Sequence, residues 1–379
     1  MPTSTTAAVA RAGADDFAWE PVVLDDPGPD EALVRMVATG LCHTDLSVLA
    51  GRLPTPLPAV LGHEGAGIVE AVGPGTRGVR PGDRVVMSFN SCGHCARCRT
   101  GQPTRCGTYF PLNFGAARPD GSTPLRTAGG EPIGGLFFGQ SSLARHAVVS
   151  VHSLVPVDPA DDRELALLAP IGCGVQTGAG AVLNVLKPGP GDTLAVFGAG
   201  AVGLSAVIAA QLSGVSTVIV ADRVPSRLTT ASELGATRTI DAGVEDLGES
   251  LADLTGGRGV TSIVETTGVP ALLDLAVTAI AAFGTVAVIG APAAGSRASF
   301  DVNALIDGRT IRGVTEGASD RVTFIPALID LFRQGRLPYD RFVEFYPAAD
   351  LAEAAKDARH GRTIKPVIVF DDHDGEAGR

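Results

Sequence analysis

The sequence has no excess of basic residues, and this deficit excludes several classes of protein. Its 30 Lys and Arg residues face 41 Asp and Glu residues, which gives a formal net charge of −11 over 379 residues. A nucleic-acid partner or an anionic membrane surface normally requires a basic face on the protein. We therefore expect neither nucleic acid nor a membrane among the partners of this chain.

Long hydrophobic runs are also scarce. The opening stretch MPTSTTAAVARAGADDF lacks the apolar core of a secretory leader. The uncharged stretch 193–221 is interrupted by Gly198, Gly200 and Gly203, and this pattern favours a buried segment of a parallel sheet over a membrane helix. We expect a cytoplasmic protein, in which thiols stay reduced and cysteines at fixed spacing indicate metal or catalytic sites before disulfides.

The pattern of apolar runs along the chain changes near residue 175. Short β-rich runs with frequent turns fill 30–90, whereas TLAVFGAG, TVIVAD, SIVETTG and GTVAVIGAP alternate with helix-like stretches farther on. The second pattern is typical of a doubly wound parallel α/β sheet, and the first of a compact β-rich domain. The chain ends in a predicted strand, TIKPVIVF, and a charged tail, DDHDGEAGR, that we expect to be frayed. We predict a first domain over 1–174 with a lobe at 91–107, a second over 175–316, and a return to the first over 317–379.

A glycine-rich turn follows the apolar run TLAVF. Gly198, Gly200 and Gly203 form the pattern G-x-G-x-x-G between a predicted strand and a predicted helix. The first glycine permits the bend, the second lets a pyrophosphate approach, and the third lets the helix pack on the sheet. The next strand ends at Asp222, nineteen positions after Gly203, where a carboxylate binds both ribose hydroxyls and repels a 2′-phosphate. The stretch predicts a site for NAD rather than NADP, a preference that the neighbouring Arg223 weakens.

Four of the six cysteines lie close together in SCGHCARCRTGQPTRC. Cys92, Cys95, Cys98 and Cys106 have the spacing C-x2-C-x2-C-x7-C, which suits a closed, structural zinc site with four thiolate ligands. The bacterial iron–sulfur pattern needs a shorter last gap followed by proline. A nucleic-acid-binding ribbon would lie in a basic domain, and two disulfides would need an oxidising compartment. We therefore predict a zinc lobe that does no chemistry.

The other two cysteines stand alone in the sequence. Cys42 lies in ATGLCHTDL, His63 in VLGHEGAG, and Cys173 in LAPIGCGVQTG, 25 positions before the glycine motif. Two thiolates and one imidazole with an open fourth position make a catalytic zinc site. Each residue alone also fits ordinary core packing, but their combination with a dinucleotide motif favours the metal site.

GLCHTDL, GHEGAGIVEAVG, the four-cysteine lobe and GAGAVG, in this order, resemble the zinc-dependent medium-chain alcohol dehydrogenases. The resemblance covers about residues 30 to 370 and implies a GroES-like catalytic domain joined to a Rossmann domain. GLFFGQSSLARHAVV, PIGCGVQTGAGAVLNVLKPG and RGVTEGAS look more like the aryl (benzyl) and allylic terpene-alcohol dehydrogenases than the ethanol enzymes.

The resemblance implies roles for residues near the predicted catalytic zinc. Thr44 is expected to hydrogen-bond the alcohol oxygen and pass its proton toward the cofactor ribose, and Asp45 to accept the free N–H of His63. Glu64 is expected to lie beside the metal or to ligate it transiently. Many family members have a histidine where this chain has Ser47, so the last leg of the proton relay is in doubt.

The resemblance also implies contacts with cofactor and substrate. His43 and Lys365 match positions at the cofactor pyrophosphate, and Ile289 matches a position beside the cofactor at the substrate pocket. The cofactor-binding set is His43, Gly198, Gly200, Ala201, Val202, Gly203, Asp222, Arg227, Ile289 and Lys365. Leu53, Phe137 and Phe138 match positions that line the substrate pocket, a set that equally fits core packing.

Together these features predict an NAD-dependent enzyme with two zinc ions per subunit that interconverts a primary aryl or allylic alcohol and its aldehyde. A homodimer or homotetramer is typical of the family. One alternative is an aldehyde–thiol adduct (formaldehyde-type) dehydrogenase of the same fold. Another is a zinc-stabilised binding protein without turnover. A zinc-free quinone or enoyl reductase is disfavoured because it would not need Cys42, His63 and Cys173.

Overall fold

A computed structural model describes residues 2–370, so the tail predicted to be frayed lies outside the described residues. The chain divides into two compact units. The first comprises the chain up to Cys173, Asp320–Ile329 and the chain from Val343 on, and the second comprises Gly174–Ser319 and Asp330–Phe342. The sequence had suggested a single return to the first unit at residue 317, whereas here the chain returns in two steps.

The first unit is built on two sheets. One has the strand order β4-β1-β2-β7-β8, and the other has the order β10-β6-β5-β3-β18-β17 with β9 also paired to β3. The strands of the first sheet are β1 (Thr3–Ala10), β2 (Ala18–Leu24), β4 (Ala59–Val60), β7 (Leu125–Thr127) and β8 (Pro132–Ile133). Those of the second are β3 (Glu31–Gly40), β5 (Gly65–Val72), β6 (Arg84–Met87), β9 (His146–Ser150), β10 (Leu154–Val157), β17 (Val343–Pro347) and β18 (Lys365–Val369).

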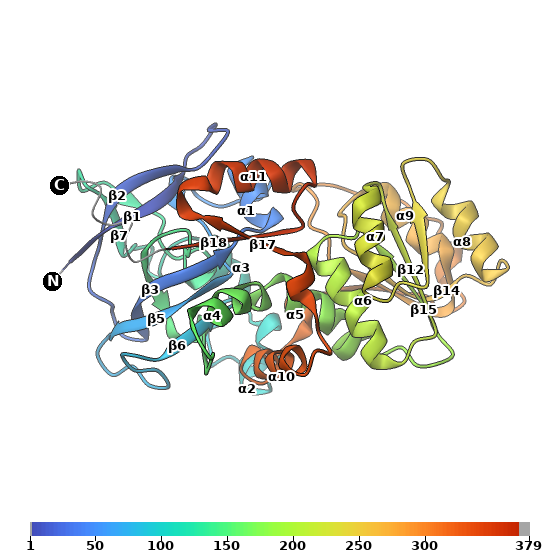
Figure 1. The fold of residues 1–379 in the computed structure, drawn as a ribbon, viewed down its shortest axis with the longest axis horizontal. Helices are drawn as coiled ribbons and strands as arrows, with labels where there is room; N and C mark the ends of the chain where they lie inside the picture. Colours follow the sequence, from blue (N-terminus) through green and yellow to red (C-terminus); the bar gives the residue numbers. More distant parts are fainter. Residues whose placement is uncertain (1, 371–379) are drawn as a thin grey trace. The chain divides into compact units, whose positions relative to one another are not determined.

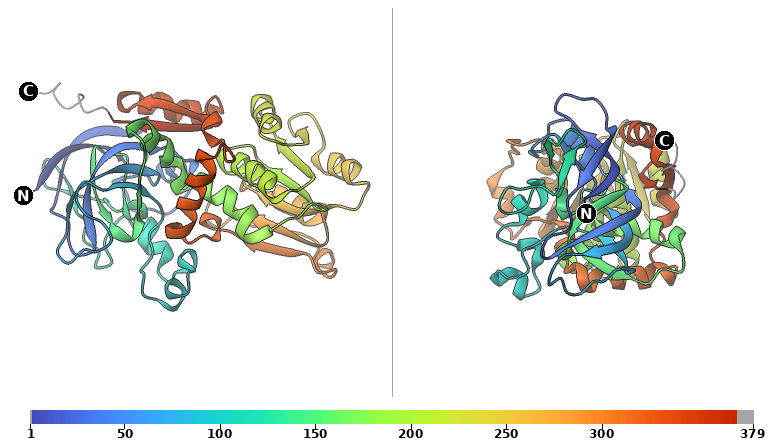
Figure 2. Two further views of the ribbon diagram at one scale, coloured as in Figure 1. Left: turned by 60° about the horizontal axis from the view of Figure 1, so that its bottom comes forward. Right: turned by 90° about the vertical axis from the view of Figure 1, so that its left-hand side faces the viewer.

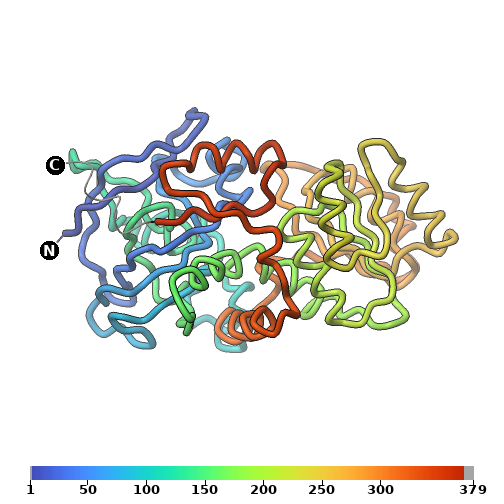
Figure 3. Tube along the Cα trace, in the orientation of Figure 1, coloured from blue at the N-terminus to red at the C-terminus, as the bar shows by residue number. Residues whose placement is uncertain are grey.

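Strand β18 is far from β3 in the sequence but lies next to it in the sheet. It pairs antiparallel with β3, with Ile368 opposite Thr39, and the red and blue segments lie side by side in Figure 3. Both strands are almost wholly buried, as expected for central strands that are covered on both faces. This pairing brings Lys365, at the start of β18, next to the segment that follows β3.

Short helices of the first unit lie in the connections. They are α1 (His43–Leu49), α2 (Ala96–Arg99), α3 (Tyr109–Phe114), α4 (Asp162–Leu168) and α11 (Leu351–His360), and α10 (Arg321–Arg333) begins in this unit. In the left-hand view of Figure 2 the cyan segment around residue 100, which contains α2, projects from the sheets. The four-cysteine stretch is therefore a separate lobe on the β-rich unit.

The second unit is a six-stranded parallel sheet of order β13-β12-β11-β14-β15-β16. This order is that of the doubly wound dinucleotide-binding fold, which confirms the predicted α/β class. Its strands are β11 (Thr193–Phe197), β12 (Thr217–Asp222), β13 (Arg238–Asp241), β14 (Val260–Glu265), β15 (Ile280–Val288) and β16 (Thr310–Gly313).

Helices cover the sheet of the second unit (Figure 1). Helix α6 packs on β11 and β12, α7 on β12 and β13, and α9 on β14 and β15 beside α8. Their bounds are α5 (Gly174–Gly180), α6 (Ala201–Ser213), α7 (Pro225–Glu233), α8 (Leu247–Thr255) and α9 (Pro270–Ala279). Helix α6 begins directly after β11, so its N-terminus points at the carboxyl edge of the sheet.

Among residues 2–370, no single helix combines the length and the apolar character needed to cross a membrane. One bent pair of helices, Asp162–Gly172 with Gly174–Leu186, has the required length and apolar character when the two helices are taken together.

Candidate active site and metal centre

Two groups of potential metal ligands stand out in the described part of the chain. Cys42, His63, Glu64 and Cys173 form one group, and the four lobe cysteines form the other. Within each group the ligand atoms all lie within 4.8 Å of one another. Both groups belong to the first unit, so the fold brings together the two ligand sets that the sequence pattern suggested.

Helix α1 positions the first group. Cys42 is its N-cap, and the Asp45 carboxylate one turn later accepts a hydrogen bond from Cys42 N at 3.0 Å. The same carboxylate accepts from Gly62 N at 3.0 Å and lies 2.9 Å from His63 Nδ1. Asp45 is 0% exposed. One buried acid therefore fixes both the segment that carries Cys42 and the segment that carries His63.

The hydrogen bonding of His63 leaves one ring nitrogen available. A carboxylate can only accept, so Nδ1 carries the proton and Nε2 presents its lone pair. Nε2 is buried and has no hydrogen-bond partner within residues 2–370. A buried polar atom without a partner is costly, and a metal ion at Nε2 removes that cost. The donor set of two thiols and one imidazole fits zinc.

Aromatic rings hold the His63 imidazole from the other side. Phe138 stacks on it with ring centroids 4.6 Å apart, and Phe137 meets it edge-on at 5.6 Å. Phe138 has a left-handed backbone, with φ of 52°, which is costly for a bulky residue and is found mostly where surrounding packing enforces it. Both rings are buried. Their expected role in lining the substrate pocket stays a prediction, and here they orient the imidazole.

The charges of this group favour a thiolate. A hydrogen bond with the Cys173 thiol lowers the pKa of Cys42 well below its ordinary value, against the effect of burial. Burial alone would lower the pKa of His63, but the Asp45 carboxylate and the nearby Cys42 thiol raise it well above its ordinary value. A cation that binds this set therefore displaces protons.

Glu64 and Lys365 form a buried ion pair next to the group. Lys365 Nζ lies 2.9 Å from both Glu64 carboxylate oxygens and donates to Leu41 O at 3.3 Å. Burial works against the ammonium, but the Glu64 charge raises the pKa of Lys365 above its ordinary value. The contact of Lys365 with a cofactor pyrophosphate stays a prediction, and in this structure its side chain is 3% exposed and pairs with Glu64.

Thr44 and Ser47 lie on α1 beside the metal ligands. Thr44 Oγ1 is 3.8 Å from Cys42 Sγ, and both hydroxyl-bearing residues are half-buried. His43, the first residue of α1, is exposed, and Leu53 is half-buried after the helix. The structure thus places Thr44 within reach of a group held at Cys42.

Gln140 is a functional candidate that the sequence did not indicate. Its Nε2 donates to His63 O and to Ser88 O, both at 3.0 Å, and its Oε1 accepts from Gly65 N at 3.0 Å. The side chain is 0% exposed. It ties the backbone on both sides of Glu64 to a neighbouring strand, which a lone glutamine in GLFFGQSS gives no spacing signal to predict.

The four lobe sulfur atoms are spaced for a shared metal rather than for disulfides. Cys92 Sγ is 3.9 Å and Cys95 Sγ is 3.6 Å from Cys98 Sγ. A disulfide would require about 2.05 Å, whereas four sulfurs at about 2.3 Å from one zinc lie about 3.8 Å apart. Backbone N–H groups of Cys92 and Cys95 donate to the Cys106 and Cys92 sulfurs, each at 3.4 Å. The lobe therefore fits tetrahedral zinc.

The pKa values of two lobe thiols differ in direction. Hydrogen bonds from the backbone, that of Cys98 first, lower the pKa of Cys95 to about 6. Burial raises the pKa of Cys98 to about 12. Cys95 thus ionises more readily than Cys98. When a divalent cation binds the lobe, all four sulfurs would be thiolates and would share the negative charge.

The second unit holds the dinucleotide motif. Gly198 has φ of 95°, and a Cβ at Gly203 would lie 1.9 Å from Gly198 O, so the turn and the close helix–strand contact require glycine at both. A Cβ at Gly200 would meet nothing within 4 Å, which leaves space above the N-terminus of α6 for a ligand. Ala201 and Val202 form the first turn of that helix.

Asp222 and Arg227 lie at the next strand–helix junction. Asp222 ends β12, and its carboxylate accepts from Ala199 N at 2.6 Å and from Val224 N at 2.9 Å. Arg227, on α7, has a buried Nε without a hydrogen-bond partner in the described range. Ile289 follows β15 and donates its N–H to Glu265 O at 2.8 Å. The glycine turn, the carboxylate and the unpartnered Nε of Arg227 fit a dinucleotide.

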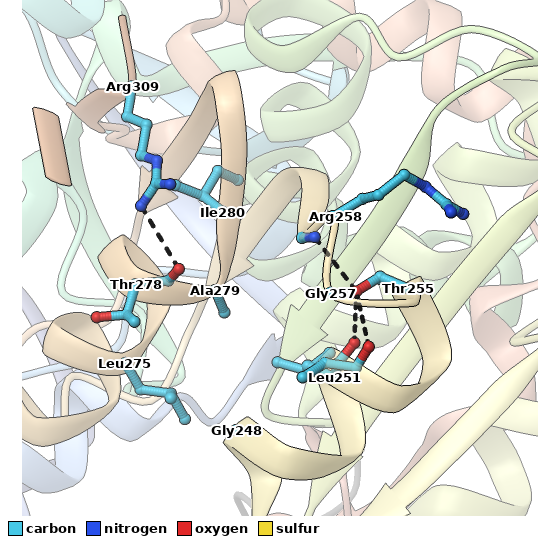
Figure 4. A pocket seen from close by; sticks show the side chains of 12 residues that line it. Gly248, Leu251, Thr255, Gly257, Arg258, Leu275, Thr278, Ala279, Ile280 and Arg309 are labelled. Carbon is cyan, nitrogen blue, oxygen red and sulfur yellow. Dashed lines mark hydrogen bonds between the residues drawn. The ribbon is translucent and has the colours of Figure 1, made fainter. Parts of the chain in front are cut away.

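The structure also has a cavity in each unit, and the one in the first unit reaches the lobe, because Cys92 and His94 are among its lining residues. One of about 250 Å³ in the second unit is shown in Figure 4, where Arg309 donates to a carbonyl group at the end of α9 and Thr255 to one in α8. The other, of about 680 Å³ in the first unit, contains Glu31 and Arg118, which bond each other. The principal polar groups of both cavities are thus engaged with the protein itself.

Comparisons with known proteins agree with this fold and with these metal-ligand groups. The Alcohol dehydrogenase GroES-like domain matches residues 28–159, and the Zinc-binding dehydrogenase family matches residues 201–333. A geraniol dehydrogenase of Castellaniella defragrans is 45% identical over 370 residues, which cover 97% of this chain and 98% of that protein. The chain belongs to the family of zinc-dependent medium-chain alcohol dehydrogenases.

Two solved structures are similar over nearly their whole length. An alcohol dehydrogenase zinc-binding domain protein from Burkholderia ambifaria is 49% identical with a TM-score of 0.93, covering 98% of this chain and 100% of that one. The benzyl alcohol dehydrogenase of Acinetobacter calcoaceticus is 43% identical with a TM-score of 0.92, covering 97% and 100%.

Proposed function

We propose that this protein oxidises primary aryl or allylic alcohols to aldehydes with NAD, and reduces the aldehydes in the reverse direction. The observation that carries the proposal is the convergence of Cys42, His63 and Cys173 around the unpartnered Nε2 of His63. The similarity to a geraniol dehydrogenase and to a benzyl alcohol dehydrogenase supports the substrate class.

Cys42, His63 and Cys173 hold the catalytic zinc in this proposal, and the four lobe cysteines hold a structural one. Zinc at the three-ligand site would act as a Lewis acid and lower the pKa of the hydroxyl group of a bound alcohol. Asp45 keeps the proton of His63 on Nδ1 and so keeps Nε2 free to ligate. The three bonds that Asp45 accepts make the ligand geometry rigid before the metal arrives.

Thr44 receives the substrate proton. Its hydroxyl lies next to Cys42, on the half-buried side of α1, where it can accept from an alcohol and donate onward in one motion. Ser47 lies one turn farther on the same helix. Because a serine has no titratable nitrogen near pH 7, the last step to solvent passes through water.

The Glu64–Lys365 pair balances charge beside the thiolates. Lys365 also raises the positive potential at Cys42 and Cys173, which in turn raise its own pKa. The second unit binds NAD by the turn from Gly198 to Gly203 and by Asp222, and NAD supplies the hydride acceptor. On this assignment the first unit is the catalytic domain and the second is the NAD-binding domain.

A homo-oligomer in the cytoplasm completes the proposal. Large apolar side chains are exposed within one stretch of the second unit: Phe283 is 83%, Val302 72% and Ile306 78% exposed. A Cβ at Gly308 would lie 2.7 Å from the Phe283 ring, so this stretch folds back on itself. Exposed apolar groups gathered in this way are typical of a subunit interface.

The test is NADH formation from NAD with benzyl alcohol, geraniol, cinnamyl alcohol and ethanol, using native and Cys42→Ser protein. We expect kcat/KM to be at least about tenfold higher for the aryl and allylic alcohols than for ethanol, a difference of about 1.4 kcal/mol. The Cys42→Ser protein should be inactive with all four. Equal turnover of ethanol would refute the substrate class. NADH formation from formaldehyde together with a thiol, and from none of the four alcohols, would indicate an adduct dehydrogenase.

A further inference from the structure

A buried arginine contacts the segment that leads into the four-cysteine lobe. Arg321 is the first residue of α10 and is 5% exposed. Its Nη1 donates to Ser91 Oγ at 3.2 Å, and its guanidinium carbon lies 5.0 Å from the centroid of the Phe89 ring. Ser91 immediately precedes Cys92 in the sequence. The guanidinium is therefore bonded to the side chain of the residue that precedes the first lobe ligand.

The segment that leaves the lobe is anchored at the same place. The Tyr109 ring lies 5.9 Å from the Phe89 ring, and Tyr109 N donates to Cys106 O at 3.0 Å. Nearby, Asn113 Oδ1 accepts from Asn90 N at 2.7 Å and its Nδ2 donates to Asn90 O at 3.0 Å. The two ends of the lobe are thus clamped together against the ring on which Arg321 stacks.

The burial of Arg321 needs a counter-charge. Its Nε is buried and has no hydrogen-bond partner within the described range, and a buried cation is tolerated only beside compensating negative charge. Burial lowers the pKa of Arg321 to about 10, opposed by Asp320 and by the thiols of Cys98 and Cys106. Four thiolates around one divalent zinc leave a net charge of about −2, so zinc binding places the missing negative charge in the lobe.

We propose that Arg321 is a positioning residue of the structural zinc site, where its positive charge balances the four thiolates and holds the lobe closed on its metal. The inference rests on the structural zinc proposed above. The Asp320 carboxylate also attracts the guanidinium, so Asp320 is the alternative to the lobe thiolates as the counter-charge of Arg321. If Asp320 alone compensated Arg321, the lobe would hold its zinc equally well without the arginine.

The test is the rate at which the lobe releases zinc to a coloured chelator, with zinc content measured by mass spectrometry. The full-length chain carries Cys42→Ser and Cys173→Ser, so that the lobe is the remaining zinc site. Arg321→Met removes the charge but keeps a long unbranched side chain, Arg321→Lys keeps the charge, and Asp320→Asn is the matched control.

We expect Arg321→Met to release zinc at least about tenfold faster, the usual size of an effect transmitted through a metal's surroundings. Arg321→Lys should remain within about threefold of the parent chain, and Asp320→Asn should release zinc no faster than the parent. This order would not arise from packing alone, because methionine and lysine have similar volumes and both lack the guanidinium group.

Two results would overturn the inference, and they differ. If the parent chain with Arg321 intact contains no zinc, the structural-zinc assignment fails and the role of Arg321 fails with it. If the parent holds zinc but Arg321→Met releases it at the parental rate, or Met and Lys behave alike, the assignment stands and the role of Arg321 is wrong. Should Arg321→Met not fold, Arg321→Gln, which also lacks the charge, takes its place. Release at least about tenfold faster than from Arg321→Lys then supports the role, and any smaller difference between the two refutes it.

Discussion

Asp45 is the residue on which the geometry of the proposed catalytic zinc depends most, and Asp45→Asn isolates its charge. An asparagine oxygen can keep the bonds of Oδ1 to Gly62 N and His63 Nδ1, but its NH2 group then faces Cys42 N. One hydrogen bond is lost, and the others no longer involve a charged acceptor. Hydrogen bonds to charged groups are worth about 1.5–3 kcal/mol, so we expect catalytic-site zinc affinity to fall about 10- to 100-fold, or about 1.4–2.8 kcal/mol.

The assay is zinc content per subunit after equilibration in buffers of graded free zinc, with Asp25→Asn as a surface control. Asp25 pairs with Arg126 and is about a third exposed. Asp45→Asn should lose one zinc at a higher free-zinc concentration than the native protein and keep the other. If it holds both ions with native affinity, Asp45 does not organise the ligands and the reasoning fails.

Further predictions concern the cofactor turn, the buried ion pair and the proton path. Gly203→Ala should lower the unfolding temperature, because its Cβ would lie 1.9 Å from a backbone oxygen, whereas Gly200→Ala should fold normally but raise the KM for NAD about tenfold or more. Glu64→Gln should cost about 3–5 kcal/mol of unfolding free energy, because it leaves the Lys365 ammonium buried and unpaired, and Lys365→Met added to it should restore part of this in denaturant titrations. Since the folded pKa of Lys365 is raised from 10.5, the stabilisation that Lys365 contributes should be undiminished at about pH 9–10 and decline above it, and a stability curve that stays flat from about pH 9 upward would contradict this. Ser47→His should shift the pH–rate profile of alcohol oxidation by adding a group that titrates near pH 6.5, and an unchanged profile would mean that the relay ends elsewhere.

The fold was predictable where the apolar pattern was strong. The runs predicted as strands became β11, β12, β14 and β15 of the parallel sheet, and the first three are mostly buried. The edge strands β13 and β16 were not anticipated, because RTID and TIRG are short and carry polar side chains. Such strands form because a neighbouring strand supplies hydrogen-bond partners, and local sequence does not record that neighbour.

The metal ligands were predictable because their chemistry is specific and their types are rare in the chain. Residues that position the metal ligands were harder to predict from the sequence. Gln140 has no distinctive spacing, and its role follows only from the pairing of β5 and β6 around it. The contact of Lys365 with a phosphate stays a prediction, and its contact with Glu64 follows only from the place of β18 in the sheet. Long-range strand pairing sets both positions.

The central claim is that turnover depends on zinc at Cys42, His63 and Cys173. Its most direct test is NADH formation from benzyl alcohol and NAD by protein from which the more labile zinc has been removed, followed as zinc is returned. Activity should rise in proportion to zinc and reach a plateau at one equivalent per subunit, and Cys173→Ser should show no recovery. Full activity before zinc is returned, or equal recovery in Cys173→Ser, would contradict the claim.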